Sequence, residues 1–197
     1  MTDPNPAARL VRGDGLVLVV VDVQDRLAAV MHRRDAVVRV AGILVRAAAI
    51  LHAPVIVTRQ YPKGLGDTAP ELIVVLDSVA ASGSPLVAVD KMDFDCMAEP
   101  TFRDALAATG RTHVALAGME THICVTQTAL ALAADGYMPH VVADAVCSRR
   151  DPDHEVALAR LRAAAVDVLP SESVIYEALG RAGTREFRAV LEVVKGA

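Results

Sequence analysis

Short, almost uniformly apolar runs alternate with amphipathic stretches along most of the chain. The intervening stretches have helical spacing, as in 36–51, where Arg39 and Arg46 share one side. Strands that are apolar on both faces are typical of a parallel sheet covered by helices on each side. The pattern predicts an α/β fold: a three-layer, doubly wound, mostly parallel sheet of about six strands. We expect these strands near 16–22, 54–58, 86–89, 113–117, 138–142 and 166–168.

A Rossmann-like strand order, 3-2-1-4-5-6, would make the first and fourth strands neighbours at the switch point of the sheet. With 197 residues, the chain is expected to form one domain, 1–197, whose core covers about 15–170. Two helices follow the core within 171–197. Their apolar stripes need a cover, so we expect a homo-oligomer through these helices.

Composition and charge exclude several classes of partner. The apolar fraction is 53% against 22% charged residues, and the net charge is −4 without runs of like charge. With aromatic residues at only 3%, we expect neither nucleic-acid nor anionic-membrane binding. No apolar run reaches the roughly 20 residues that span a bilayer, and Met1–Pro6 does not resemble a signal peptide. We expect a cytoplasmic protein.

The cysteines and histidines do not form a recognisable metal or disulfide pattern. Cys96, Cys124 and Cys147 are odd in number and far apart, so we expect free thiols. The six histidines are dispersed, and none pairs with a carboxylate at clear ligand spacing. We therefore expect no metal and no cofactor. The segment 64–69 matches G-x-G-x-x-A, but a dinucleotide site needs that motif directly after the first strand. We instead expect a loop over the non-periodic stretch 59–67.

Three reactive residues fall at the ends of predicted strands. Asp22 ends the first, Lys91 follows the third, and Cys124 lies where a helix begins after the fourth. A thiol at a helix N-terminus is biased toward the thiolate, which attacks carbonyl carbons. Each residue also has an ordinary explanation: a cap for Asp22, a solvated lysine for Lys91, and a small buried side chain for Cys124.

Two further cysteines and one histidine lie close to this constellation in the sequence. Cys147 follows the apolar run 141–146 and could reach the same edge of the sheet, so it is a rival nucleophile. Cys96, in the loop after Lys91, suits pocket lining better. His122 adjoins the nucleophile segment, where we expect a structural or substrate-facing role.

At these residues the chain resembles the isochorismatase-like cysteine hydrolases. Their Asp-x-Gln motif is matched by Asp22-Val23-Gln24, their lysine by Lys91, and their Gly-x-x-Thr-x-x-Cys-Val segment by 118–125. The similarity runs from about Gly15 to the C-terminus. Residues 61–66 resemble the isochorismatase domain-containing branch, whose substrates are mostly unassigned.

The resemblance implies a catalytic triad of Asp22, Lys91 and Cys124. It also implies a cis peptide between Met119 and Glu120, and an oxyanion hole formed by the backbone N–H groups of Glu120 and Cys124. The candidates for substrate binding lie near the ends of the first three predicted strands: Gln24, Tyr61 and Phe94, with Arg59 and Gln60 as further pocket residues.

The implied function is a hydrolase that cleaves a small amide-like C–N bond through a thioester on Cys124, with Asp22 as base and acid in turn. Thr58-Arg59-Gln60-Tyr61-Pro62 lacks the metal-binding histidines of nicotinamidases, which makes nicotinamide a poor candidate. An intact Cys124 favours an amide over the vinyl ether of isochorismate. Two alternatives stay open: a vinyl-ether hydrolase, and a non-catalytic oligomeric scaffold or redox-sensing protein.

Overall fold

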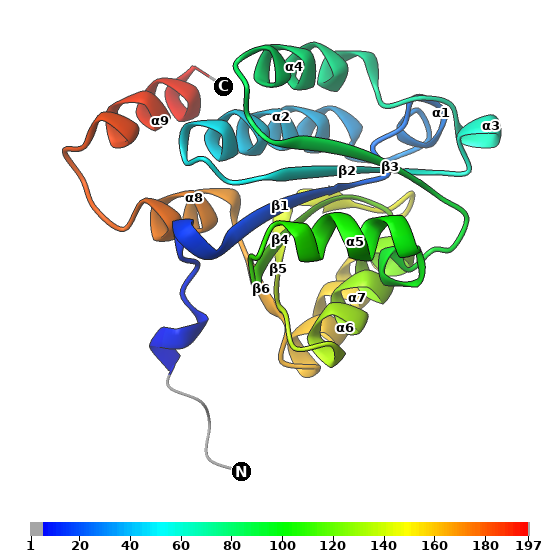
Figure 1. Ribbon diagram of the computed structural model, residues 1–197. Coiled ribbons are helices and arrows are strands. Elements are labelled where there is room, and N and C mark those ends of the chain that lie inside the picture. The colour runs from blue at the N-terminus through cyan, green and yellow to red at the C-terminus, as the bar shows by residue number, and fades with distance from the viewer. Residues whose placement is uncertain (1–5, 197) are drawn as a thin grey trace.

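The computed structural model describes residues 6–196 and contains one six-stranded parallel sheet (Figure 1). Its strand order is β3-β2-β1-β4-β5-β6, which confirms the predicted α/β fold and order. Met1–Asn5, part of the argument for a cytoplasmic protein, and Ala197 lie outside the described residues. The strands are β1 Leu16–Val21, β2 Val55–Gln60, β3 Leu86–Lys91, β4 His113–Met119, β5 Met138–Cys147 and β6 Asp167–Leu169.

Helices cover both faces of the sheet. On one face α2, α4, α8 and α9 enclose one apolar cluster, and on the other α5, α6 and α7 enclose a second (Figure 1). The helices are α1 Asp25–Ala28, α2 Arg34–Ile50, α3 Pro62–Leu65, α4 Pro70–Ala81, α5 Pro100–Ala108, α6 Thr126–Ala134, α7 Asp151–Ala163, α8 Ser171–Leu179 and α9 Arg185–Lys195. Short 3₁₀ turns are Pro6–Arg9, Gly13–Gly15 and Cys96–Ala98.

The local sequence explains the elements that carry the site. All six residues of β1 are buried, because this central strand is covered from both faces. Gly118, near the end of β4, has φ of +123°, and a Cβ there would lie 1.9 Å from the carbonyl oxygen of Val21. Only glycine therefore fits where β4 passes closest to β1.

Three details differ from the sequence-based expectations. Residues 59–67, expected to be a loop, include the end of β2 and the short helix α3, which begins at Pro62. Lys91 is the last residue of β3 rather than a loop residue. The stripes of α8 and α9 are covered within the chain: Val174, Ile175 and Val190 are buried in the cluster that also contains α2. The reason for expecting an oligomer through these helices is therefore gone.

Within residues 6–196, no helix is both long enough and apolar enough to cross a membrane.

Two buried histidines stack at the opposite end of the sheet from the strand ends that carry Asp22 and Lys91. The ring centroids of His113 and His140 are 5.2 Å apart, and His113 Nδ1 lies 3.0 Å from His140 Nε2. The other nitrogen of His140, Nδ1, has no hydrogen-bond partner among the described residues and lies 3.5 Å from a carboxylate oxygen of Asp167. Burial and the adjacent His113 lower the pKa of His140 to about 4.

This pair predicts a loss of stability in mild acid. Because the pKa of His140 is lower in the folded state than in the unfolded chain, the unfolded chain binds more protons between about pH 6.5 and 4. The contribution of His140 to the free energy of unfolding is fully present above that window. It falls by roughly 3 kcal/mol as the pH decreases across the window. Urea denaturation at several pH values should show this slope, and His140→Gln should reduce it. The exposed His52→Asn is the control; an unchanged slope in His140→Gln would contradict the assignment.

Candidate active site

A buried ion pair lies at the carboxyl ends of the strands. Lys91 Nζ donates to Asp22 Oδ2 over 2.7 Å, and both side chains are completely inaccessible to solvent. Asp22 directly follows β1 with φ of +53°, a left-handed conformation that Asp tolerates better than most residues. Its second oxygen, Oδ1, accepts from Thr58 Oγ1 over 2.7 Å. The carboxylate is therefore fixed in orientation from two sides.

The ammonium group of Lys91 has its donors occupied. Besides Asp22, it donates to Gln60 Oε1 over 2.7 Å and to the carbonyl oxygen of Asp93 over 3.2 Å. Burial acts to lower the pKa of Lys91, but Asp22 and the charged forms of the nearby thiols favour the ammonium and raise the pKa above its usual value. Lys91 therefore acts as a fixed positive charge rather than as a proton donor.

Gln24 and Gln60 hold this arrangement in place. Gln24 Oε1 accepts from the backbone N–H of Gln60 over 2.7 Å, while its Nε2 donates to the carbonyl oxygens of Gln60 and Gly66. Gln60 Nε2 donates to the Met92 carbonyl oxygen, which turns Gln60 Oε1 toward Lys91. Both hydrogens of the Gln24 amide are used internally, so we no longer expect Gln24 to bind substrate.

Cys124 lies beside the ion pair, on a π-helical turn, Thr121–Val125, that follows β4 and leads into α6. The bond between Met119 and Glu120 is a cis peptide. Only 5% of Cys124 is exposed. Burial, the negative charge of Asp22 and a hydrogen bond to Asp22 raise the pKa of the thiol, and Lys91 opposes them only in part. The helix-start argument for a thiolate does not hold in this resting site, because burial outweighs it.

Side chains around the nucleophile turn fix its shape. Thr121 Oγ1 lies 3.0 Å from Nδ1 of the buried His154, and Thr126 Oγ1 donates to the Thr121 carbonyl oxygen. His122 Nδ1 lies 2.9 Å from Ser148 Oγ. Nothing in the sequence marks His154 as part of this region, since only the packing of α7 against the turn brings it close.

Glu120 contributes its backbone to the site and its side chain elsewhere. Its carboxylate accepts from the backbone N–H and Nε of Arg149, over 2.9 and 3.1 Å. Within residues 6–196, its own backbone N–H donates no hydrogen bond. That N–H is therefore unpaired among the described residues.

The remaining cysteines differ in placement. Cys96 is fully buried, and its pKa, raised to about 12 mainly by burial, is also influenced by Lys91 and Asp22. Cys147 ends β5 opposite Met119, but its side chain belongs to the apolar cluster on the other face of the sheet from Cys124. Cys147 is therefore a poor rival nucleophile.

Three large apolar side chains are exposed beside the site, at its rim, together with the charged Asp93. Tyr61 is 47% exposed, Phe94 53% and Met92 65%. The Tyr61 backbone N–H donates to the Lys91 carbonyl oxygen, which ties this rim to the ion pair. Arg59 is paired with Asp67 and Asp90 at 2.7 Å each. Among the described residues, no three His, Cys, Asp or Glu side chains are grouped to hold a metal.

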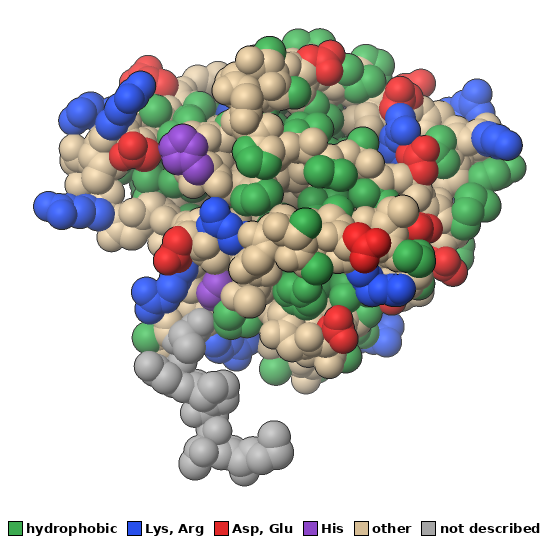
Figure 2. Space-filling model, viewed as in Figure 1, with side chains coloured by type: hydrophobic (Ala, Val, Ile, Leu, Met, Phe, Trp, Pro, Cys, Tyr) green, Lys and Arg blue, Asp and Glu red, His purple; other side chains and the backbone are tan. Residues whose placement is uncertain are grey.

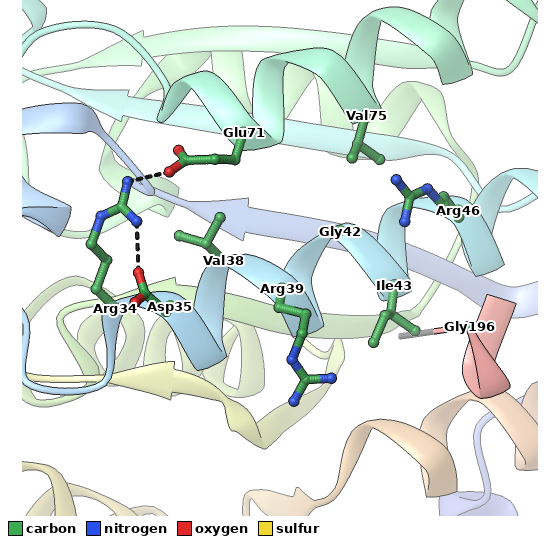
Figure 3. A pocket seen from close by; sticks show the side chains of 10 residues that line it. All are labelled: Arg34, Asp35, Val38, Arg39, Gly42, Ile43, Arg46, Glu71, Val75 and Gly196. Carbon is green, nitrogen blue, oxygen red and sulfur yellow. Dashed lines mark hydrogen bonds and ion pairs between the residues drawn. The ribbon is translucent and has the colours of Figure 1, made fainter.

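A surface groove of about 430 Å³ lies away from this site, between α2 and α4 (Figure 3). Arg34 closes one end through ion pairs with Asp35 and Glu71, and Arg46 stands at the other end. None of the candidate catalytic residues lines the groove. We therefore place the chemistry at the strand ends rather than in this groove.

Comparison with known proteins gives a consistent result. The isochorismatase domain matches residues 17–173. The secreted isochorismatase effector Isc1 of Phytophthora sojae is 35% identical over 91% of this chain and 84% of its own length. Isochorismatase domain-containing protein 2 of Bos taurus is 33% identical over 99% and 90%. The structure of the MAR1 ribonuclease from Caenorhabditis elegans superposes with a TM-score of 0.83, at 32% identity over 94% and 92%.

The buried pair predicts an asymmetric response to mutation. Lys91→Met leaves Asp22 as an uncompensated buried charge and should lower the free energy of unfolding by about 3–5 kcal/mol. Asp22→Asn/Lys91→Met removes both charges and should be more stable than Lys91→Met alone. Denaturant titration measures each, and Arg150→Met, in an exposed ion pair with Asp153, is the matched control with a cost of at most about 1 kcal/mol. A double variant no better than Lys91→Met would contradict a charged pair.

Proposed function

This chain belongs to the isochorismatase family of hydrolases, and from that premise we propose that it cleaves a small amide-like C–N bond through a covalent thioester on Cys124. The observation that carries the proposal is the position of the thiol. Burial and the adjacent Asp22 carboxylate raise the pKa of the Cys124 thiol, and Lys91 and Thr58 fix the orientation of that carboxylate. Base and nucleophile are therefore paired before substrate arrives.

The proposed reaction begins from the neutral thiol. Asp22 takes the proton as the sulfur attacks the substrate carbonyl carbon, so the thiolate forms only during the attack. The acid form of Asp22 then protonates the leaving nitrogen, the C–N bond breaks, and an amine and a thioester result. Asp22 next removes a proton from water, which attacks the thioester. The acid product leaves, and the proton returns to sulfur.

Lys91 and the backbone of Glu120 have separate parts in this proposal. The fixed ammonium charge favours the thiolate as it develops and restores the carboxylate form of Asp22 after each transfer. The free N–H of Glu120, with that of Cys124, would receive the negative charge on the substrate oxygen. Tyr61 and Phe94 would contact the rest of the substrate from the rim.

Other functions fit the site less well. A vinyl ether needs protonation rather than a nucleophile, which leaves Cys124 without a role. The name ribonuclease belongs to the relative from C. elegans, and the net charge of −4 here favours a small substrate over RNA. A cytoplasmic location stays a prediction, since one relative is named as secreted.

Turnover should depend on Cys124. In a screen of small amides followed by ammonia or amine release, Cys124→Ala should lose at least about a thousandfold in kcat while Cys147→Ala stays close to wild type. Intact-mass spectrometry after rapid quenching should find an acyl adduct on Cys124. Full turnover by Cys124→Ala would exclude the covalent route.

The resting protonation of Cys124 gives a test that needs no substrate. Because Asp22 raises the pKa of the thiol, Asp22→Asn should lower that pKa and speed alkylation by iodoacetamide, roughly tenfold per unit of pKa at pH 8. Asp22→Asn should at the same time lose turnover. The alkylation rates of Cys96 and Cys147, measured by peptide mapping in the same samples, are the control. They should stay unchanged unless the substitution loosens the fold. Slower alkylation of Cys124 in Asp22→Asn would mean that the carboxylate does not face the thiol.

A further inference from the structure

The two edges of the sheet are protected very differently. At β6 the strand is only three residues long, and Arg9 crosses beside it, pairing with Asp167 at 2.6 Å and donating to the Ala165 carbonyl oxygen. At β3 the strand is six residues long, and no described segment pairs with its outer side. An uncovered edge strand is a template for pairing with another chain.

The free backbone groups on β3 can be assigned from its bonds to β2. Val55 N–H donates to the Pro85 carbonyl oxygen at one end, and Tyr61 N–H donates to the Lys91 carbonyl oxygen at the other. The backbone N–H and carbonyl groups of successive residues point to alternate sides of a strand. Those of residues 85, 87, 89 and 91 therefore point toward β2. Leu86, Ala88 and Asp90 therefore point their N–H and carbonyl groups outward, away from the sheet.

The side chains along this edge suit association rather than solvation. Val87 is 46% exposed, Ala88 is also exposed, and neighbouring α4 exposes 69% of Val74. Figure 2 looks onto this face and shows backbone and hydrophobic atoms along its middle, with charged side chains around them. The strand has no lysine directed outward, no bulge and no proline within 86–91, the devices that usually block edge pairing.

We propose that β3 pairs antiparallel with β3 of a second copy of this chain, about a twofold axis at Ala88, to give one continuous sheet across the dimer. In this register Ala88 faces Ala88 of the second copy, and Leu86 faces its Asp90. Each of these pairs joins two outward-facing residues, so about six backbone hydrogen bonds form without disturbing the bonds to β2. Val87 is then covered by Val89 of the second copy.

Charge favours a second copy as the occupant. The only charged side chain among the outward residues is Asp90, and Arg59 neutralises it within the same chain at 2.7 Å. In the proposed register the two Asp90 residues are offset by four positions, roughly 14 Å. That separation exceeds the screening length of about 8 Å at physiological salt. The edge is thus compatible with its own copy.

The position of Ala88 allows a selective test. Ala88→Pro removes an N–H that faces outward, so it should block the pairing while leaving every hydrogen bond to β2 intact. Val87→Lys places a charge on the same edge. Val156→Lys, at an equally exposed valine on α7, is the control. Light scattering coupled to size exclusion should give wild type and Val156→Lys a mass of two copies of 20.8 kDa or an even multiple, and both edge variants half of that mass.

Hydrogen exchange on the wild-type protein supplies a second measurement that needs no variant to fold. The amides of Ala88 and Asp90 should exchange as slowly as those of Val87 and Val89, although only the latter bond within one chain. A monomeric wild type, fast exchange at Ala88 and Asp90, or an assembly that persists in both folded edge variants would each overturn the proposal. Persistence of the assembly in both edge variants would mean that it forms through another surface. Pairing of β3 only with a peptide from another protein would assign the edge to that partner.

Discussion

The arrangement of the site depends on the buried ion pair between Lys91 and Asp22. Removing two charges from solvent costs desolvation free energy, which further hydrogen-bond partners of each charge offset. Thr58, Gln60 and the Asp93 carbonyl complete the pair. Gln24 then holds Gln60 through two hydrogen bonds and Gly66 through a third. Because the buried ion pair needs hydrogen-bond partners from all three strands, it fixes the carboxyl ends of β1, β2 and β3 relative to each other. Cys124 lies beside this edge of the sheet.

Much of this could be predicted from the sequence, because the reactive residues follow buried strands. In a parallel sheet, the carboxyl ends of the strands meet at one edge, so the sequence predicts that Asp22, Lys91 and Cys124 lie together. The strand order is not contained in the alternation of apolar runs and helices; it is the usual order of doubly wound sheets, and this sheet has it. Lys91 has to reach across β2 to meet Asp22, and its long side chain does so.

The supporting residues could not be predicted, because their roles depend on register rather than on position in the chain. Thr58 bonds to Asp22 and Gln60 to Lys91 because side chains alternate along β2. Nothing in the local sequence marks Thr58, and the sequence indicates Gln60 only as a pocket residue. His154 meets Thr121 through the packing of α7, thirty-three residues away. The covered stripes of α8 and α9 show the same limit: an amphipathic helix reveals that it needs a partner surface but not which one.

The thiol shows why burial has to be weighed against local charge. A helix start and a nearby ammonium both favour a thiolate, and sequence alone reveals only those two influences. The structure adds desolvation and the adjacent carboxylate, which together reverse the sign for the resting Cys124. A neutral thiol next to an ionised base has a chemical advantage of its own. It resists oxidation and stray alkylation, because the reactive thiolate exists only while a carbonyl carbon is in place to accept it. The same burial that suppresses the thiolate at rest strengthens its interaction with Lys91 once it forms, since charges attract more strongly where water is excluded.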